Sequence, residues 1–194
     1  MKLHPALAIA LTLLTASAFA AEPAAPPEPW GAVPSERQLN WHETEYYALP
    51  HYTMGTYVGQ DWPWGSDDAS LINPKKFDAD KWCRVYKEAG MRGVVFFVKH
   101  HDGFCVWQSD YTTYDMEASP WKNGKGDMLA EMAAACKRHG LKLGVYYSFW
   151  DRHRADWGKP GYLPHLKNQM RELFTNYGDL FMVWIDGAHG AGGY

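Results

Sequence analysis

Two histidines and an aspartate follow an apolar segment in residues 98–109, which read VKHHDGFCVWQS. Imidazole and carboxylate groups in this arrangement could hold a metal ion, transfer protons or hydrogen-bond the hydroxyl groups of a sugar. Adjacent strand residues point to opposite faces of a sheet, so His100 and His101 are poorly placed to share one metal ion. A turn beginning at His101 would aim both rings at a small polar ligand instead. We therefore predict no metal site here, and we expect Asp102 to organise the loop.

A carboxylate ends the apolar segment LFMVWID at residues 180–186. Burial would raise the pKa of Asp186 unless hydrogen-bond donors hold the anion. Trp184 has the same strand parity as Asp186, so both side chains point into the same space, and Tyr146 could face it from the preceding strand. An aromatic ring beside a carboxylate suits a glycosidase, whose nucleophile or base acts at the anomeric carbon. The structural alternative is a turn aspartate preceding Gly187.

Apolar strands alternate with amphipathic helices along the chain. Strands are expected at 93–99, 141–148 and 180–186, and helices at 78–89, 128–139 and 162–177. An earlier strand is expected near 47–57, although Pro50 is unfavourable inside a strand. This order predicts parallel βα units whose strands are buried on both faces.

All three strands end in polar, ionisable or aromatic groups, and ligands of parallel α/β proteins bind outside the carboxyl ends of the strands. The group that follows the strand at 141–148 is Trp150-Asp151-Arg152. In it we expect Asp151 to organise its loop rather than act in catalysis. The spacing fits a TIM barrel, and a doubly wound sheet would give a similar pattern. No Gly-rich phosphate-binding turn follows a strand, which argues against a nucleotide site, and we predict no cofactor.

The composition narrows the class of protein further. The chain has 194 residues and a formal net charge of -3, enough for one globular domain and without a basic stripe for nucleic acid. Its 10 Trp and 12 Tyr fit either a large aromatic core or a carbohydrate site. The three cysteines lack metal-binding spacing; Cys83 and Cys136 are expected in the core, and the disulfide state of these two and Cys105 stays open.

The first 20 residues have the pattern of a secretory signal peptide. Lys2 precedes a short apolar run and the small-residue end Ala18-Phe19-Ala20, and the run is shorter than the roughly 20 residues of a membrane span. A Pro- and Ala-rich leader is expected at 21–37, and the folded domain at 38–194. We therefore expect a secreted or periplasmic protein without a membrane span.

Five segments identify a family resemblance: KHHDGFCVWQS, GDMLAEM, GLKLGVYYSFWDRH, QMRELFTNYG and FMVWIDGAHG. In this order they resemble family 29 glycoside hydrolases, the α-L-fucosidases, and the resemblance runs over residues 48–194. It implies a (β/α)8 TIM-barrel catalytic domain, a retaining mechanism through a covalent fucosyl-enzyme, and fucosylated oligosaccharides or glycoconjugates as substrates.

The resemblance also assigns roles to individual residues. Asp186 matches the catalytic nucleophile, and His100 and His101 match the pair that binds the hydroxyls of fucose. The remaining matches are substrate-binding residues, namely His51, Trp64, Tyr146 and Trp184. The segment HYTMG around His51 departs from the family's tighter motif.

Length is a second departure from the family. A complete barrel takes about 250 residues, whereas roughly 150 follow the leader here, so only about the first half of the barrel is expected. Retaining chemistry needs a second carboxyl group, the general acid/base, and no segment matches it. The chain is thus expected to be an N-terminal fragment that is inactive or unstable alone; release of p-nitrophenol from its α-L-fucoside would contradict this.

Two other functions remain open at this point. One is a non-catalytic fucose-binding protein, and the other is a metal-dependent hydrolase that uses His100, His101 and Asp102. Activity that survives a chelator would exclude the second. The sequence leaves the oligomeric state and the linkage preference undetermined.

Overall fold

The computed structural model describes residues 25–187 of the chain. Residues 25–33 belong to a separate unit without helix or strand, and the folded unit begins at Pro34. The predicted signal peptide and residues 21–24 of the predicted leader lie outside the described residues. Helix α1 (Glu36–His42) begins just before the predicted end of the leader, because the side chains of Ser35 and Gln38 cap its first turn reciprocally.

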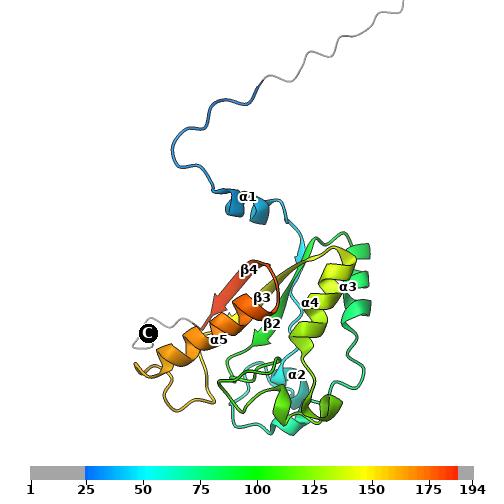
Figure 1. Ribbon diagram of the computed structural model, residues 1–194, viewed down its shortest axis with the longest axis vertical. Coiled ribbons are helices and arrows are strands. Elements are labelled where there is room, and N and C mark those ends of the chain that lie inside the picture. Colours follow the sequence, from blue (N-terminus) through cyan, green and yellow to red (C-terminus); the bar gives the residue numbers. More distant parts are fainter. Residues whose placement is uncertain (1–24, 188–194) are drawn as a thin grey trace, which may run out of the picture. The chain divides into compact units, whose positions relative to one another are not determined.

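Four parallel strands form one sheet in the order β1-β2-β3-β4 (Figure 1). The strands are β1 (Tyr47–Ala48), β2 (Gly93–Lys99), β3 (Lys142–Ser148) and β4 (Leu180–Asp186). The helices after α1 are α2 (Met54–Val58), α3 (Ala79–Glu88), α4 (Met128–His139) and α5 (Tyr162–Asn176). The predicted α/β class with parallel βα units is confirmed.

The prediction of one strand over 47–57 is wrong. Strand β1 has only two residues, and the chain then forms helix α2. Pro50 removes a backbone donor that a longer strand would use. The amide of Thr53 bonds the hydroxyl of Thr56 in the first turn of α2, and Gly59 ends the helix with a left-handed φ of 68°.

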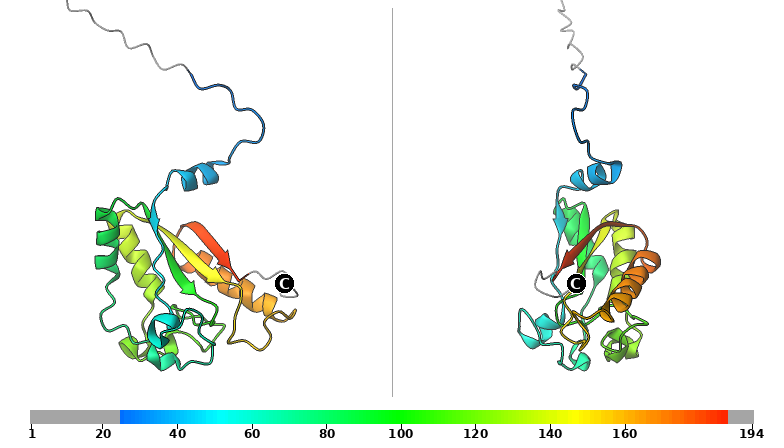
Figure 2. Two further views of the ribbon diagram at one scale, coloured as in Figure 1. Left: turned by 180° about the vertical axis from the view of Figure 1, so that it is seen from behind. Right: turned by 90° about the vertical axis from the view of Figure 1, so that its left-hand side faces the viewer.

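Helices α3, α4 and α5 cover one face of the sheet, which we call the outer face (Figures 1 and 2). Its core includes Val94 and Phe96 of β2, Val145 of β3 and Leu129 of α4, and the predicted core cysteines Cys83 and Cys136 are buried there. Among the described residues every cysteine is a free thiol. No helix in the described part is long and apolar enough to cross a membrane.

The other face, the inner face, carries a smaller apolar cluster of Val95, Phe97 and Tyr146. The alternation along β2 is interrupted, because its register with β3 shifts between Phe97 and Lys99. Val98 packs in the outer core, and Lys99, the residue after it, is paired with Tyr147 of the same face. This β-bulge decides which side of the sheet each of the next residues faces.

Candidate active site

A pocket of about 440 Å³ opens at the carboxyl ends of β2, β3 and β4. It brings together six of the residues selected from the sequence, namely His51, His100, His101, Tyr146, Trp184 and Asp186. Leu49, Trp62, Phe97 and Trp150 also line it and were not selected. Asp186 is the only carboxylate among its described lining residues.

Trp64 is the exception among the predicted site residues. It does not line the pocket; its ring lies 3.9 Å from the guanidinium carbon of Arg152 and is 64% exposed. Trp62, two residues earlier, occupies the pocket edge and meets the His101 ring edge-on at 5.4 Å. The two tryptophans flank Pro63 in an irregular loop, where strand parity gives no guide to direction.

Asp186 is held as an anion by two donors. The hydroxyl of Tyr146 donates to Oδ2 at 2.5 Å, and the amide of Gly187 donates to Oδ1 at 2.6 Å. Partial desolvation alone would raise the pKa of Asp186, but these bonds and the nearby histidines lower it below its usual range. The side chain keeps 46% of its surface exposed. An ionised, accessible carboxylate therefore lies at the mouth of the pocket.

The hydrogen bonds of Ser148 fix the tautomer of His101. The hydroxyl of Ser148 donates its one proton to the carbonyl of Trp150 at 2.8 Å, so it must accept from Nδ1 of His101 at 2.7 Å. Nε2 then faces Oδ2 of Asp186 at 4.0 Å. In a neutral ring this nitrogen is a hydrogen-bond acceptor.

His100 is neutral in the same pocket. Burial, and the neighbouring rings of His101 and His51, lower its pKa to about 3. Its ring centroid lies 4.1 Å from that of His101 and 4.7 Å from that of His51. Both histidines of the pair line the pocket, as expected if a turn begins at His101. The neutral ring of His100 can donate to or accept from hydroxyl groups.

Asp102 has the loop-organising contact expected of it. Its Oδ1 accepts from the amide of Phe104 at 2.9 Å, whereas its Oδ2 has no hydrogen-bond partner among the described residues. Burial raises the pKa of Asp102 to about 6. Within the described residues, no group of three or more His, Cys, Asp or Glu side chains is placed to hold a metal ion.

A buried cation lies on the outer face, behind the histidine pair. The side chain of Lys99 is fully buried, and its Nζ donates to Asp151 at 2.8 Å. Three further acceptors surround Nζ, namely Tyr147, Tyr162 and Gln169. Burial alone would lower the pKa of Lys99, but the hydroxyl groups and the carboxylate raise it. We call these five residues the outer cluster.

Asp151 has the structural role predicted for it. Beyond its ion pair with Lys99, it accepts from the amides of His153 and Arg154, which fold the loop after β3. Sequence reasoning did not select Lys99, although a lysine at the end of a buried apolar strand requires a buried partner.

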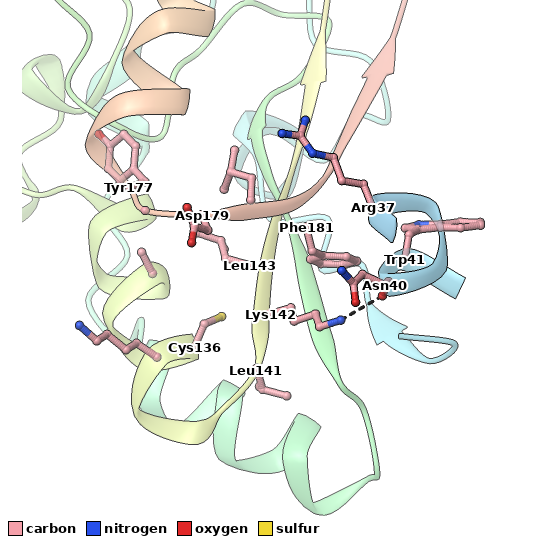
Figure 3. A pocket seen from close by; sticks show the side chains of 14 residues that line it. Arg37, Asn40, Trp41, Cys136, Leu141, Lys142, Leu143, Tyr177, Asp179 and Phe181 are labelled. Atoms are coloured by element: carbon pink, nitrogen blue, oxygen red, sulfur yellow. Dashed lines mark hydrogen bonds between the residues drawn. The ribbon is translucent and has the colours of Figure 1, made fainter. Parts of the chain in front are cut away.

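A larger cavity, of about 1080 Å³, lies at the opposite ends of β3 and β4, beside α1 and α4 (Figure 3). Asp179 is the one acidic residue among its described lining residues, and Lys142 donates to the carbonyl of Asn40 at 3.0 Å. Ligands of parallel α/β proteins bind at the carboxyl ends of the strands, where the histidines and Asp186 gather. The smaller pocket is therefore the candidate site.

The comparisons with known proteins identify the family of the chain. A family model described as alpha-L-fucosidase matches residues 29–192. The chain belongs to the alpha-L-fucosidase family. The predicted resemblance is thus confirmed over almost all of the described chain.

Two plant members of the alpha-L-fucosidase family illustrate the similarity. Over 161 residues the chain is 41% identical to alpha-L-fucosidase 1 of Arabidopsis thaliana, covering 82% of this chain and 32% of that protein. Over 189 residues it is 42% identical to putative alpha-L-fucosidase 1 of Oryza sativa subsp. japonica, covering 96% of this chain and 37% of that protein. The chain thus spans about a third of the length of these relatives.

Solved structures of the family share the fold described above. A glycoside hydrolase 29 family member from an unknown rumen bacterium aligns with a TM-score of 0.81 and 52% identity, over 84% of this chain and 29% of that one. A Ruminococcus gnavus GH29 fucosidase mutant in complex with fucose aligns with a TM-score of 0.74 and 34% identity, over 82% of this chain and 37% of that one.

Proposed function

We propose that the chain supplies the nucleophile and the fucose-binding pocket of a retaining α-L-fucosidase. The substrates are glycans or glycoconjugates with terminal α-linked L-fucose, and the four strands are part of a (β/α)8 barrel. Asp186 is the nucleophile, and the imidazole rings of His100 and His101 hold the sugar hydroxyls. Trp184 and Tyr146 provide aromatic surface.

One observation carries this proposal: an ionised and accessible carboxylate at the mouth of a pocket built from neutral imidazoles and aromatic rings. Neutral imidazoles suit a polyhydroxylated, uncharged ligand better than an anionic one. The family membership and a relative solved in complex with fucose support the same substrate.

The chemistry then runs in two balanced steps. Oδ of Asp186 forms a bond to the anomeric carbon of fucose as the glycosidic C–O bond breaks, and a general acid protonates the leaving oxygen. Water then hydrolyses the ester and returns a proton to that acid, which regenerates Asp186. No second carboxylate lines the described pocket, so we assign only the nucleophile to these residues.

A reagent that needs no general acid tests this assignment. In 2-deoxy-2-fluoro-L-fucosyl fluoride the fluoride ion leaves without protonation when the nucleophile attacks the anomeric carbon. The 2-fluoro group then slows hydrolysis of the resulting ester. We expect the purified chain to gain one fluorofucosyl group, which peptide mass spectrometry locates on Asp186. Asp186→Asn should abolish labelling, and circular dichroism should show that this variant keeps the fold.

The outcomes separate the competing functions. A wild-type chain that binds L-fucose but is never labelled would favour the fucose-binding protein over the enzyme. Labelling at a residue other than Asp186 would refute the nucleophile assignment. Labelling that disappears after chelation and returns with a divalent metal would favour the metal-dependent hydrolase.

Export is a separate part of the proposal. The signal-peptide pattern at residues 1–20 supports secretion or periplasmic location, with cleavage before Ala21. Expression of the full chain in a bacterial host, followed by intact mass measurement of the periplasmic fraction, tests it. A protein that retains residues 1–20 in the cytoplasm would contradict it.

A further inference from the structure

A stack of flat side chains extends from the rim of the pocket to the surface. Trp150 lines the pocket, and the guanidinium carbon of Arg152 lies 5.0 Å from the centroid of its ring. The same carbon lies 3.9 Å from the ring centroid of Trp64, which is 64% exposed. The mechanism proposed above uses neither Trp64 nor Arg152.

Hydrogen bonds hold this stack in place against the pocket. Nη1 of Arg152 donates to the carbonyls of Trp62 and Pro63 at 2.8 and 3.0 Å, so the guanidinium joins the loop after α2 to the loop after β3. His153 donates from Nδ1 to the carbonyl of Gly65 at 2.6 Å and strengthens the same connection.

Gly65 allows the two loops to approach closely. Its φ is +77°, and a Cβ atom there would lie 2.6 Å from the carbonyl oxygen of Asp102 and from the amide nitrogen of His153. Only glycine fits this position without a shift of backbone. The segment that carries Trp64 is therefore packed against the histidine loop rather than free in solvent.

The stack offers the chemistry of a second sugar site. An exposed indole face packs against the C–H face of a pyranose, and a planar guanidinium donates to its hydroxyls. Nε and Nη2 of Arg152 make no hydrogen bond with any other described residue, so these donors are available to a ligand. A charge fixed between rings also loses little freedom when it binds.

We propose that Trp64 and Arg152 form the subsite for the leaving group, and that they bind the pyranose to which the fucose is attached. The inference rests on the proposed function, because the pocket must hold fucose for the next sugar to reach the stack. It names the substrate class more narrowly: fucose linked to another sugar, rather than fucose on a small or flexible alcohol.

Binding to thio-linked fucosyl disaccharides tests the inference, because the sulfur linkage resists hydrolysis. Calorimetry or saturation-transfer NMR compares methyl α-L-fucopyranoside with 1→2, 1→3, 1→4 and 1→6 linked probes on the full chain. We expect at least one disaccharide to bind more tightly than the monosaccharide. Trp64→Ala should weaken that disaccharide by about two- to tenfold and leave the monosaccharide unchanged.

Matched variants separate stacking from charge and from general damage. Trp64→Phe should keep part of the higher affinity for the disaccharide over the monosaccharide. Arg152→Lys should lose most of this difference, because an ammonium group lacks the planar set of N–H donors of a guanidinium. Trp30→Ala, at a tryptophan that is 96% exposed outside the folded unit, should change neither affinity.

The results distinguish failure of this inference from failure of the proposed function. Equal affinity for all probes, or an equal loss for monosaccharide and disaccharide in Trp64→Ala, would overturn the subsite while fucose binding stands. Absence of binding to every fucoside would overturn the proposed function and the subsite together.

Discussion

The outer cluster around Lys99 and the pocket around Asp186 lie on opposite faces of the same sheet edge, and their charges are compensated differently. In the outer cluster the ammonium of Lys99 is fully buried and meets a carboxylate and three neutral acceptors. In the pocket, Nδ1 of His100 has no hydrogen-bond partner among the described residues, and Asp186 stays half-exposed.

This difference shows how burial and hydrogen bonding distinguish a charged group with a structural role from one that can bind a ligand. A buried, fully paired cation has no remaining capacity for a ligand, and its partners hold two loops together. Neutral imidazoles and an accessible carboxylate keep hydrogen-bonding capacity for hydroxyl groups. Four experiments test this distinction.

The largest effect is expected when the buried ion pair of the outer cluster is broken. Lys99→Met leaves the carboxylate of Asp151 buried without its cation, which should lower the free energy of unfolding by about 3–5 kcal/mol. Urea denaturation measures it. The double variant Lys99→Met/Asp151→Asn should recover part of the loss, and a single-variant loss below about 1 kcal/mol would contradict the structural role.

Asp102 should make stability fall as pH rises. Its pKa is raised from 3.8 to about 6, so the native state holds the proton more tightly than the unfolded chain. The protonated Asp102 contributes about 3 kcal/mol to the free energy of unfolding below about pH 4. This contribution is lost as the pH rises through about 6. Relative to wild type, Asp102→Asn should gain stability over that window in urea titrations at pH 4, 5, 6 and 7. A pH-independent difference would refute the assignment.

Two neighbouring tyrosines of β3 should give different phenotypes. Tyr146→Phe removes a donor to Asp186, so the pKa of the carboxyl rises, and the pH at which fluorofucosyl labelling begins should increase by about one unit. Tyr147→Phe removes a hydroxyl that bonds Lys99 and Gln169, and should lower stability without moving that pH profile. The same pH shift in both variants would erase the distinction between the two faces.

The smallest effect is expected for an ion pair in solvent. Arg84 and Glu88 lie one helical turn apart on α3 at 3.0 Å, with side chains that are 51% and 63% exposed. Arg84→Ala should change the free energy of unfolding by less than about 0.5 kcal/mol in 0.15 M salt. A loss comparable to that of Lys99→Met would show that burial does not control the value of these charges.

Most of the elements could be predicted because their signals are local. The apolar run of β2 and the segment between Asp127 and Gly140 gave the observed bounds of β2 and α4, since cap and stop residues mark the helix ends. The error near Pro50 arose because β1 is two residues long and follows no alternation.

The site was predictable where strand parity applies. Trp184 and Asp186 lie opposite Tyr146 and Ser148 in the sheet, as their positions along β4 and β3 require. Parity gives no guide in loops, so the choice of Trp64 rested on the family resemblance alone, whereas Trp62 lines the pocket. The partner of Lys99 comes from a loop 52 residues later, and no local pattern signals it.

The register shift in β2 determines toward which face of the sheet Lys99 and His100 point. With strict alternation, Lys99 would follow Phe97 onto the inner face and its ammonium would enter the pocket, while His100 would point into the helices. One extra residue reverses both assignments. The identity of the pocket thus depends on a one-residue frame as much as on the residues that fill it: the same sequence in a strand without the bulge would place an ammonium group, rather than an imidazole, in the pocket.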